Sequence, residues 1–302
     1  TAQSTATTAK NTADGAQNVA NNAAAKATRA ETSANAALDL ARGAASTYFH
    51  VNRGVIDIDE PEAGKTTNEG TVRSAAGAQG SFSITAGVQA TTAETAYNAI
   101  AMGYGASAAS GAEDAVVIGA NSAVRTRATN ATLLGSNSVV EAGAQNATVV
   151  GQFSAAGENS LNATVVGSRS YVRPNTNDGT ALGHYAGVDN STTNGTSVGA
   201  RTWVGANVNN GTALGVYNLI GNGTSNGIAI GVGNNIADGK QNNTVIGHNN
   251  KIKANGTTVI GNGVEVAAGL DNAVVLGNHS TTTGSHTVAN VTSAQVGNLT
   301  YS

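Results

Sequence analysis

The sequence predicts a mainly β protein, a parallel β-solenoid preceded by an N-terminal coiled-coil helix. Short apolar runs that end in glycine recur about every 16 residues, and alanines follow a regular spacing over the first 44 residues. The 302 residues include 39 Gly and no Cys, and only 4% are aromatic and 11% charged. A single compact core needs more bulky side chains to offset chain entropy. These observations favour repeated units that pack only on their neighbours.

Residues 1–47 are predicted to form an alanine-rich stalk. From Ala2 to Ala44 the alanines recur at alternating steps of four and three residues. This is the period of the a and d positions of a left-handed coiled coil. An alanine seam buries little area, and Gly15 and Gly43 weaken the helix further, so a disordered segment is the alternative. A stalk of this kind needs an oligomer elsewhere in the chain to hold it together.

Residues 48–82 are predicted to be an irregular junction between the stalk and the repeats. They contain four clustered carboxylates: Asp57, Asp59, Glu60 and Glu62. Oxygen ligands of this kind suit Ca²⁺, and a solvated acidic loop is the alternative interpretation.

Residues 83–282 are predicted to form a roll of about thirteen coils, each with two short strands. A repeat this short is too small for a helix pair or a propeller blade. The interval between glycines is 16 residues throughout, except for one interval of 14 between Gly247 and Gly261. The closing glycines are Gly87, Gly103, Gly119, Gly135, Gly151, Gly167, Gly183, Gly199, Gly215, Gly231, Gly247, Gly261 and Gly277.

Columns of equivalent residues suggest which side chains face inward. We predict that the interior holds the residue before each glycine (as in Ile118 and Leu134), the small residue three after it and the apolar residue five after it (as in Val124). Asparagines in the polar turns, such as Asn130 and Asn146, suit a positive φ.

The residue two before each glycine is then predicted to point outward. A coil of 14 to 16 residues is too thin to bury both faces of its first strand, and a continuous apolar stripe marks an interface. We therefore expect a cyclic homo-oligomer, for which a trimer is suitable and a dimer is not excluded by geometry. The residues predicted at this trimer interface are Val117, Leu133, Val149, Val165, Val245, Val259 and Val275.

One outward surface is rich in aromatic residues and arginine. It combines the column two after glycine with the column four after it, over five successive coils. Neighbouring coils would place these side chains about 5 Å apart, within reach of cation–π contacts. The group is either a self-stacking ladder that stiffens the roll or an adhesive patch that binds a ligand. Its members are Phe153, Arg169, Tyr171, Tyr185, Arg201, Trp203, Tyr217 and Leu219.

The repeat resembles the YadA-like head of trimeric autotransporter adhesins. The residues that carry the resemblance are those of the coil N-A-T-L-L-G-S-N-S-V-V (130–140), and they recur in register over residues 83–282. The segment Y-F-H-V-N (48–52) resembles the stalk-to-head junctions of this family, and residues 283–302 would begin a neck or connector. The resemblance implies a left-handed parallel β-roll assembled as a homotrimer.

The resemblance also implies a function in attachment to host extracellular matrix, host cells or other bacteria. We therefore expect a non-enzymatic adhesin at the bacterial cell surface, a fragment of the passenger whose outer-membrane anchor lies outside this chain. We expect no cofactor, no metal and no nucleic-acid partner, since the formal net charge is −3 and the 15 Lys and Arg are spread along the chain.

Three alternatives stay open. A phage tail fibre would also be trimeric and could carry similar heptads. A solenoid enzyme would need a catalytic constellation, and the carboxylates and histidines, His184 and His248 included, do not form one in sequence. An ice-binding solenoid would need a flat outward threonine array, and we place the threonine column three before glycine, Thr132 to Thr258, on the interior side.

Overall fold

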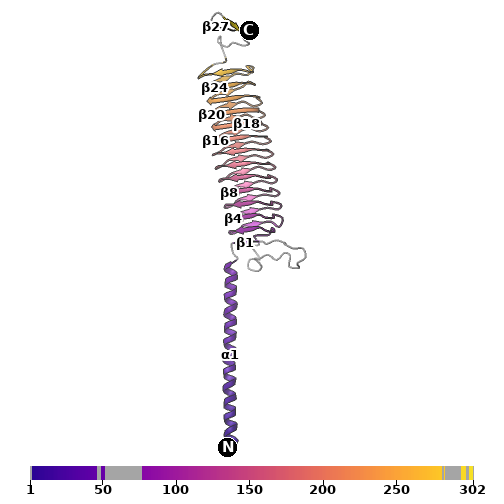
Figure 1. Ribbon diagram of the computed structural model, residues 1–302, viewed down its shortest axis with the longest axis vertical. Helices are drawn as coiled ribbons and strands as arrows, with labels where there is room; N and C mark the ends of the chain where they lie inside the picture. Colours follow the sequence, from indigo (N-terminus) through magenta and orange to yellow (C-terminus); the bar gives the residue numbers. More distant parts are fainter. Residues whose placement is uncertain are drawn as a thin grey trace.

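The computed structural model describes residues 2–45, 49–51, 77–280, 282, 294–296 and 299–301. Figure 1 shows one long helix and a stack of short strands. The helix is α1 (Ala2–Ala45). The strands are β1 (Phe49–Val51), β2 (Ile84–Ala86), β3 (Thr91–Thr92), β4 (Ile100–Met102), β5 (Ser107–Ala108), β6 (Val116–Ile118), β7 (Ala123–Val124), β8 (Thr132–Leu134), β9 (Val139–Val140), β10 (Thr148–Val150), β11 (Ala155–Ala156), β12 (Thr164–Val166), β13 (Tyr171–Val172), β14 (Thr180–Leu182), β15 (Gly187–Val188), β16 (Thr196–Ala200), β17 (Trp203–Val204), β18 (Asn209–Val216), β19 (Leu219–Ile220), β20 (Ser225–Val232), β21 (Asn235–Ile236), β22 (Thr244–His248), β23 (Lys251–Ile252), β24 (Thr258–Asn262), β25 (Glu265–Val266), β26 (Val274–Leu276), β27 (Ala294–Val296) and β28 (Leu299–Tyr301).

The strands form the predicted parallel β-solenoid. The even-numbered strands β2 to β26 stack in a 14-stranded sheet that β1 joins antiparallel to β2, and the odd-numbered strands β3 to β25 form a 12-stranded sheet. The roll has about twelve turns rather than thirteen, because no second strand follows β26 in the described residues. The predicted register is confirmed: Thr148 pairs with Thr132 and Thr164, and Thr244 pairs with Thr258 across the shortened coil.

The N-terminal helix is present as predicted. Ala2–Ala45 is one continuous helix, and the side chains described on it, up to residue 37, are exposed. Threonine hydroxyls along it donate hydrogen bonds to the backbone carbonyl four residues earlier, as that of Thr7 does to Gln3. The described helix is not long and apolar enough to cross a membrane. Whether it pairs with further copies of itself stays a prediction.

The core runs along the inside of the roll between the two sheets. It contains the apolar column five after each glycine, as predicted: Val124, Val140 and Val172 are fully buried. It also contains a column of small residues four before glycine, among them Ala131 and Ala147. Alanine here leaves room for the branched side chains of the opposite sheet, and the interior is filled by side chains one coil at a time.

The predicted faces of the first strand are wrong. The column two before glycine lies inside the roll, fully buried within a single chain, and the column one before glycine points outward. The residues predicted at a trimer interface are therefore core residues: Val117, Leu133, Val149, Val165, Val245 and Val259 at 0% exposure and Val275 at 7%. The residues predicted inside are partly exposed, such as Ile118 at 41% and Leu134 at 37%.

The backbone at the corner of each coil explains this error. An interior that holds both the residue one before glycine and the residue five after it requires the alternation of strand sides to continue across the glycine. The glycine has a large positive φ (146° at Gly151), and the residue two later is also left-handed (55° at Phe153). Two such residues form a sharp turn in the chain. The alternation of inward and outward side chains therefore holds within each strand but does not continue from one strand to the next.

The same correction applies to the threonine column. Thr132, Thr148 and Thr164 lie two residues before an outward residue, and they are half-buried on the outer face of the 14-stranded sheet. This placement overturns the reason given above for setting an ice-binding solenoid aside.

The interior also contains a hydrogen-bonded polar column three residues after glycine. In the earlier coils it is serine, as predicted: Ser138 donates to the carbonyl of Gly151, 2.7 Å away. In later coils asparagine replaces it. The Nδ2 group of Asn234 donates to the carbonyl of Gly247 at 2.8 Å, and its Oδ1 accepts from the Nδ2 of Asn250, also at 2.8 Å. These serine and asparagine side chains are thus satisfied by the next coil, which fixes the register along the axis.

Candidate binding surface

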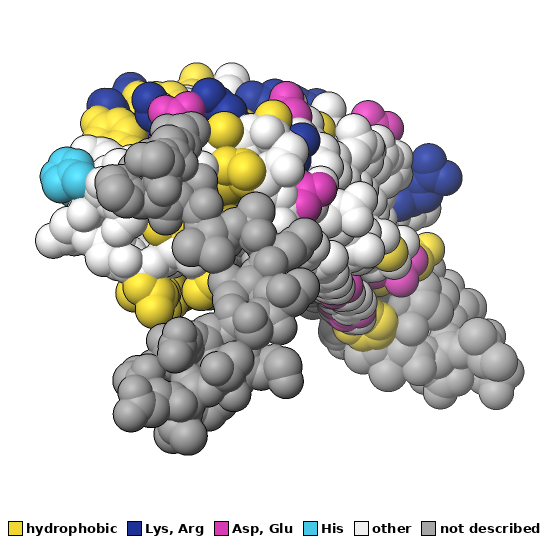
Figure 2. All heavy atoms as spheres, turned by 90° about the horizontal axis from the view of Figure 1, so that it is seen from above, with side chains coloured by type: hydrophobic (Ala, Val, Ile, Leu, Met, Phe, Trp, Pro, Cys, Tyr) yellow, Lys and Arg dark blue, Asp and Glu magenta, His cyan; other side chains and the backbone are white. Residues whose placement is uncertain are grey.

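The predicted aromatic and arginine residues lie together on one side of the roll. We call this surface the ladder and define it as the eight residues predicted above together with Arg173, which the structure adds. The five residues two after glycine, Phe153 to Tyr217, form its first column, at the corner between the two sheets. The second column consists of Tyr171, Trp203 and Leu219, four residues after glycine, on the outer face of the 12-stranded sheet. Figure 2 shows Lys and Arg side chains interleaved with hydrophobic ones along one side of the molecule.

The first column occupies backbone positions that ordinarily disfavour such residues. Each of its five members has a φ between 54° and 57°. Asn121 and Asn137 hold the same position in the two preceding coils, and Gly233 and Asn249 hold it in the two that follow. Bulky residues in this region cost on the order of 1–3 kcal/mol each, whereas glycine and asparagine tolerate it. Five successive coils therefore carry side chains that the fold itself does not favour.

Arginines and rings alternate in this first column, as the sequence predicted. The guanidinium of Arg169 lies 5.7 Å from the ring centroid of Phe153 and 5.5 Å from that of Tyr185. Arg201 lies 5.7 Å from the Tyr185 ring and 5.5 Å from the Tyr217 ring. Arg169 also donates a hydrogen bond to the hydroxyl of Tyr185, and Arg201 donates one to Tyr217 at 2.7 Å. Each arginine is thus held between two rings while remaining exposed.

The second column centres on Trp203. Its ring lies 5.3 Å from that of Tyr171, two coils earlier, in an edge-to-face arrangement with an interplanar angle of 73°. The residue between them in the sheet is Gly187, which has no side chain to separate the rings. Leu219 is the register neighbour of Trp203 on the other side. The structure therefore brings together all eight residues that the sequence proposed for this surface.

Sequence reasoning missed Arg173 as part of this surface. Its guanidinium lies 5.1 Å from the Tyr171 ring centroid and 5.8 Å from that of Trp203, and it forms an ion pair with Asp189 at 3.4 Å. The available signal was its position two residues after Tyr171, which puts both side chains on the same side of the chain.

The arginines of the ladder differ in their electrostatic environment. Arg173 is neutralised by Asp189, as Arg125 elsewhere is by Glu141 at 2.8 Å. Among the described residues no carboxylate lies within ion-pair distance of Arg169 or Arg201. The first column therefore has two uncompensated positive charges between aromatic rings.

The second exposed feature is the outer face of the 14-stranded sheet. The column one before glycine lines it with partly exposed aliphatic side chains through successive coils, from Met102 at one end to Leu276 at the other. Beside it runs the column that includes Thr132 to Thr258. A contiguous apolar stripe of this length is unusual on a protein that stays monomeric.

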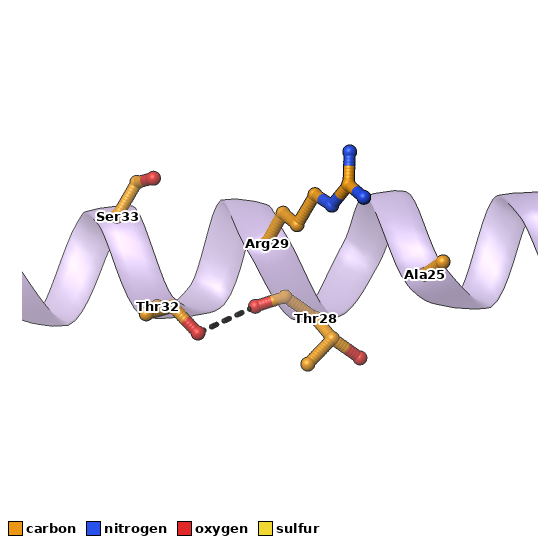
Figure 3. Close-up of a pocket in the computed structure, with 5 residues that line it drawn as sticks. All are labelled: Ala25, Thr28, Arg29, Thr32 and Ser33. Atoms are coloured by element: carbon orange, nitrogen blue, oxygen red, sulfur yellow. Dashed lines mark hydrogen bonds between the residues drawn. The ribbon is translucent and has the colours of Figure 1, made fainter.

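Other parts of the described chain offer no comparable site. No group of three or more His, Asp or Glu able to hold a metal occurs in the residues that the structure describes. A shallow hollow on α1 is lined by Ala25, Thr28, Arg29, Thr32 and Ser33 (Figure 3). Its side chains follow the helix surface without converging. The hydroxyl of Thr32 already donates a hydrogen bond to the carbonyl of Thr28, at 2.9 Å. The acidic cluster Asp57 to Glu62 lies outside the described residues.

No protein-family model matches the chain, and no curated protein matches it significantly.

Proposed function

We propose that this chain is the rod-shaped binding part of a non-enzymatic bacterial surface adhesin, and that the ladder is its contact surface. The observation that carries the proposal is the choice of residues in the first column. Phe, Arg and Tyr replace Asn or Gly at five successive left-handed positions, at a cost to the fold. Tyr, Trp and Arg are also the residues that most often dominate binding energy at interfaces.

We further propose that the chain assembles as a homotrimer through the outer face of its 14-stranded sheet. This replaces the interface residues predicted from the sequence with the column that includes Ile118 and Leu134, whose exposed aliphatic side chains would be covered by two further copies. The ladder lies at the corner and on the other sheet, so assembly through this face leaves it open. Three copies on one rod would convert weak contacts into avidity.

The proposal draws on the resemblance of the repeat to YadA-like heads, which implies attachment to host matrix, host cells or other bacteria from the bacterial outer membrane. A phage tail fibre is the alternative. The gene regions that flank this chain distinguish the two: a C-terminal membrane barrel indicates an autotransporter, and a baseplate-binding end indicates a fibre.

A substitution to asparagine tests whether the ladder binds or only stiffens the roll. Asparagine suits the left-handed backbone of Phe153, Tyr185 and Tyr217, so the triple variant should be at least as stable to heat as the unmodified chain. Adhesion of the purified protein to cultured cells and immobilised matrix proteins should fall sharply. A stiffening role predicts the opposite pattern, with lowered stability and unchanged adhesion.

The outward threonines give one specific reason to test ice binding as a second candidate. Thr132, Thr148 and Thr164 form a regular, half-buried column on the outer face of the 14-stranded sheet. If this face binds ice, the purified chain is a monomer in light scattering and shows thermal hysteresis. If the face is an interface, the chain is a trimer and shows none.

A further inference from the structure

The two unpaired arginines of the ladder have hydrogen-bonding capacity left for a ligand. A guanidinium has five N–H donors, and the structure uses one of them in each of Arg169 and Arg201, toward a tyrosine hydroxyl. The rings on either side hold each guanidinium in place and leave it exposed. A guanidinium fixed in this way is suited to bind a carboxylate or sulfate with little loss of side-chain entropy.

The spacing of the ladder restricts which ligands fit. Like residues recur every second coil: Arg169 and Arg201, the rings of Tyr185 and Tyr217, and the rings of Tyr171 and Trp203. With strands about 4.8 Å apart, this repeat is about 9.6 Å. An extended peptide places the side chains of one face about 6.7 Å apart. The carboxylates of an acidic peptide therefore do not match the spacing of the arginines.

A linear polysaccharide matches this repeat. The length of an extended disaccharide is close to the two-coil spacing, and a sugar ring offers a flat C–H face that packs on an aromatic ring. A chain with one anionic group in each disaccharide would present a charge at each arginine, and its sugar rings would reach ladder rings that have a face free, such as the exposed ring of Tyr217.

We propose that the ladder binds a linear acidic polysaccharide, with one carboxylate or sulfate in each disaccharide, lying along the axis of the rod. Its anionic groups bind Arg169 and Arg201, and its sugar rings stack on Tyr217 and Trp203, whose rings are not enclosed between two guanidiniums as that of Tyr185 is. The inference rests on the proposed function of the ladder as a contact surface and names the chemistry of the ligand.

The length of the ladder sets the length of the smallest good ligand. Phe153 and Tyr217 are four coils apart, which is about 19 Å and the span of about two disaccharides. A hyaluronan tetrasaccharide, which has one carboxylate in each disaccharide, should therefore bind nearly as well per site as longer oligosaccharides. The disaccharide should bind much more weakly.

The experiment is calorimetric titration of the full chain with hyaluronan oligosaccharides, with neutral dextran oligosaccharides as the control ligand. We expect hyaluronan to bind, dextran not to bind, and the hyaluronan affinity to fall as salt is raised. Equal binding of dextran, or no binding of any hyaluronan length, would overturn the inference.

A matched pair of variants separates the ladder from general charge. Arg201→Asn should lower the hyaluronan affinity by about tenfold, the loss expected for one charge-assisted hydrogen bond. Arg127→Asn makes the same change at an exposed arginine that is also left-handed, with φ 58°, but lies outside the ladder. It should leave the affinity within about twofold. Equal losses in the two variants would show non-specific attraction and contradict the proposed site.

Adhesion measured beside this titration distinguishes failure of the ligand class from failure of the proposed function. If the chain adheres to cells and the triple ladder variant does not, but hyaluronan fails to bind, the ligand class is wrong and the contact surface stands. If the ladder variant adheres as well as the unmodified chain, both proposals are wrong.

Discussion

The indole ring of Trp203 lies directly over the backbone of Gly187, in the preceding coil. A methyl group added at Gly187 would overlap three carbon atoms of that ring. The edge-to-face contact between Trp203 and Tyr171 therefore exists because the residue between them has no side chain.

Replacing Gly187 by alanine should displace the tryptophan ring without unfolding the roll. Gly187 has no positive φ, so alanine imposes no backbone strain, and the loss is the ring contact worth about 0.5–1.5 kcal/mol. We expect a red shift in tryptophan fluorescence, which reports one residue since the chain has a single Trp. Unchanged fluorescence would show that the ring is not held against Tyr171.

The two faces of the first strand should respond in opposite ways to a charge. Leu133→Asp places a carboxylate in the dry interior at a cost of several kcal/mol, so the roll should lose its β-sheet signal in circular dichroism. Leu134→Asp, one residue later, places it on the outer face and should keep the sheet signal, while light scattering should show loss of the proposed trimer. A Leu133→Asp protein that folds normally would contradict the face assignment of this structure.

Two glycines with positive φ should differ in what alanine costs. Gly239 has open space around it, so Gly239→Ala should cost about 1–2 kcal/mol for the left-handed backbone alone. Gly183 has a φ of 137°, and its added methyl would overlap the carbonyl of Gly199 in the next coil. Gly183→Ala should cost more than about 3 kcal/mol, measured by urea unfolding, because the backbone has to move. Similar costs would mean that neighbouring coils are less tightly stacked than described.

One acid-sensitive contact lies near the C-terminal end of the roll. The hydrogen bond from Lys253 and its positive charge hold the pKa of Glu265 below its ordinary value of 4.5, with the two side chains 2.6 Å apart. A lowered folded-state pKa stabilises the fold above the ordinary value, and this stability is lost as the pH falls through the folded pKa. Glu265→Gln should therefore lower stability at pH 7 and make no difference at pH 2. NMR titration of the Glu265 carboxyl measures the pKa directly, and an ordinary value would rule the contact out.

Much of the roll can be read from the sequence because its period is strict. The register of Thr148 with Thr164 and the stacking of Arg169 between Phe153 and Tyr185 both follow from counting along the chain. The direction of Leu133 does not, since it depends on how far the backbone turns at Gly135 and at the left-handed Asn137. Arg173 lies six residues after glycine, beyond the end of β13 and outside both predicted columns, and only the structure shows its guanidinium over the rings of Tyr171 and Trp203.

In-register stacking has a consequence for how such a rod can evolve. Because Thr132, Thr148 and Thr164 occupy equivalent places in successive coils, duplicating or deleting one whole coil preserves every column above and below the change. The rod can thus gain or lose reach in single steps through simple genetic recombination. An insertion of one residue within a strand has no such freedom, because it would put every later side chain of that strand on the wrong side.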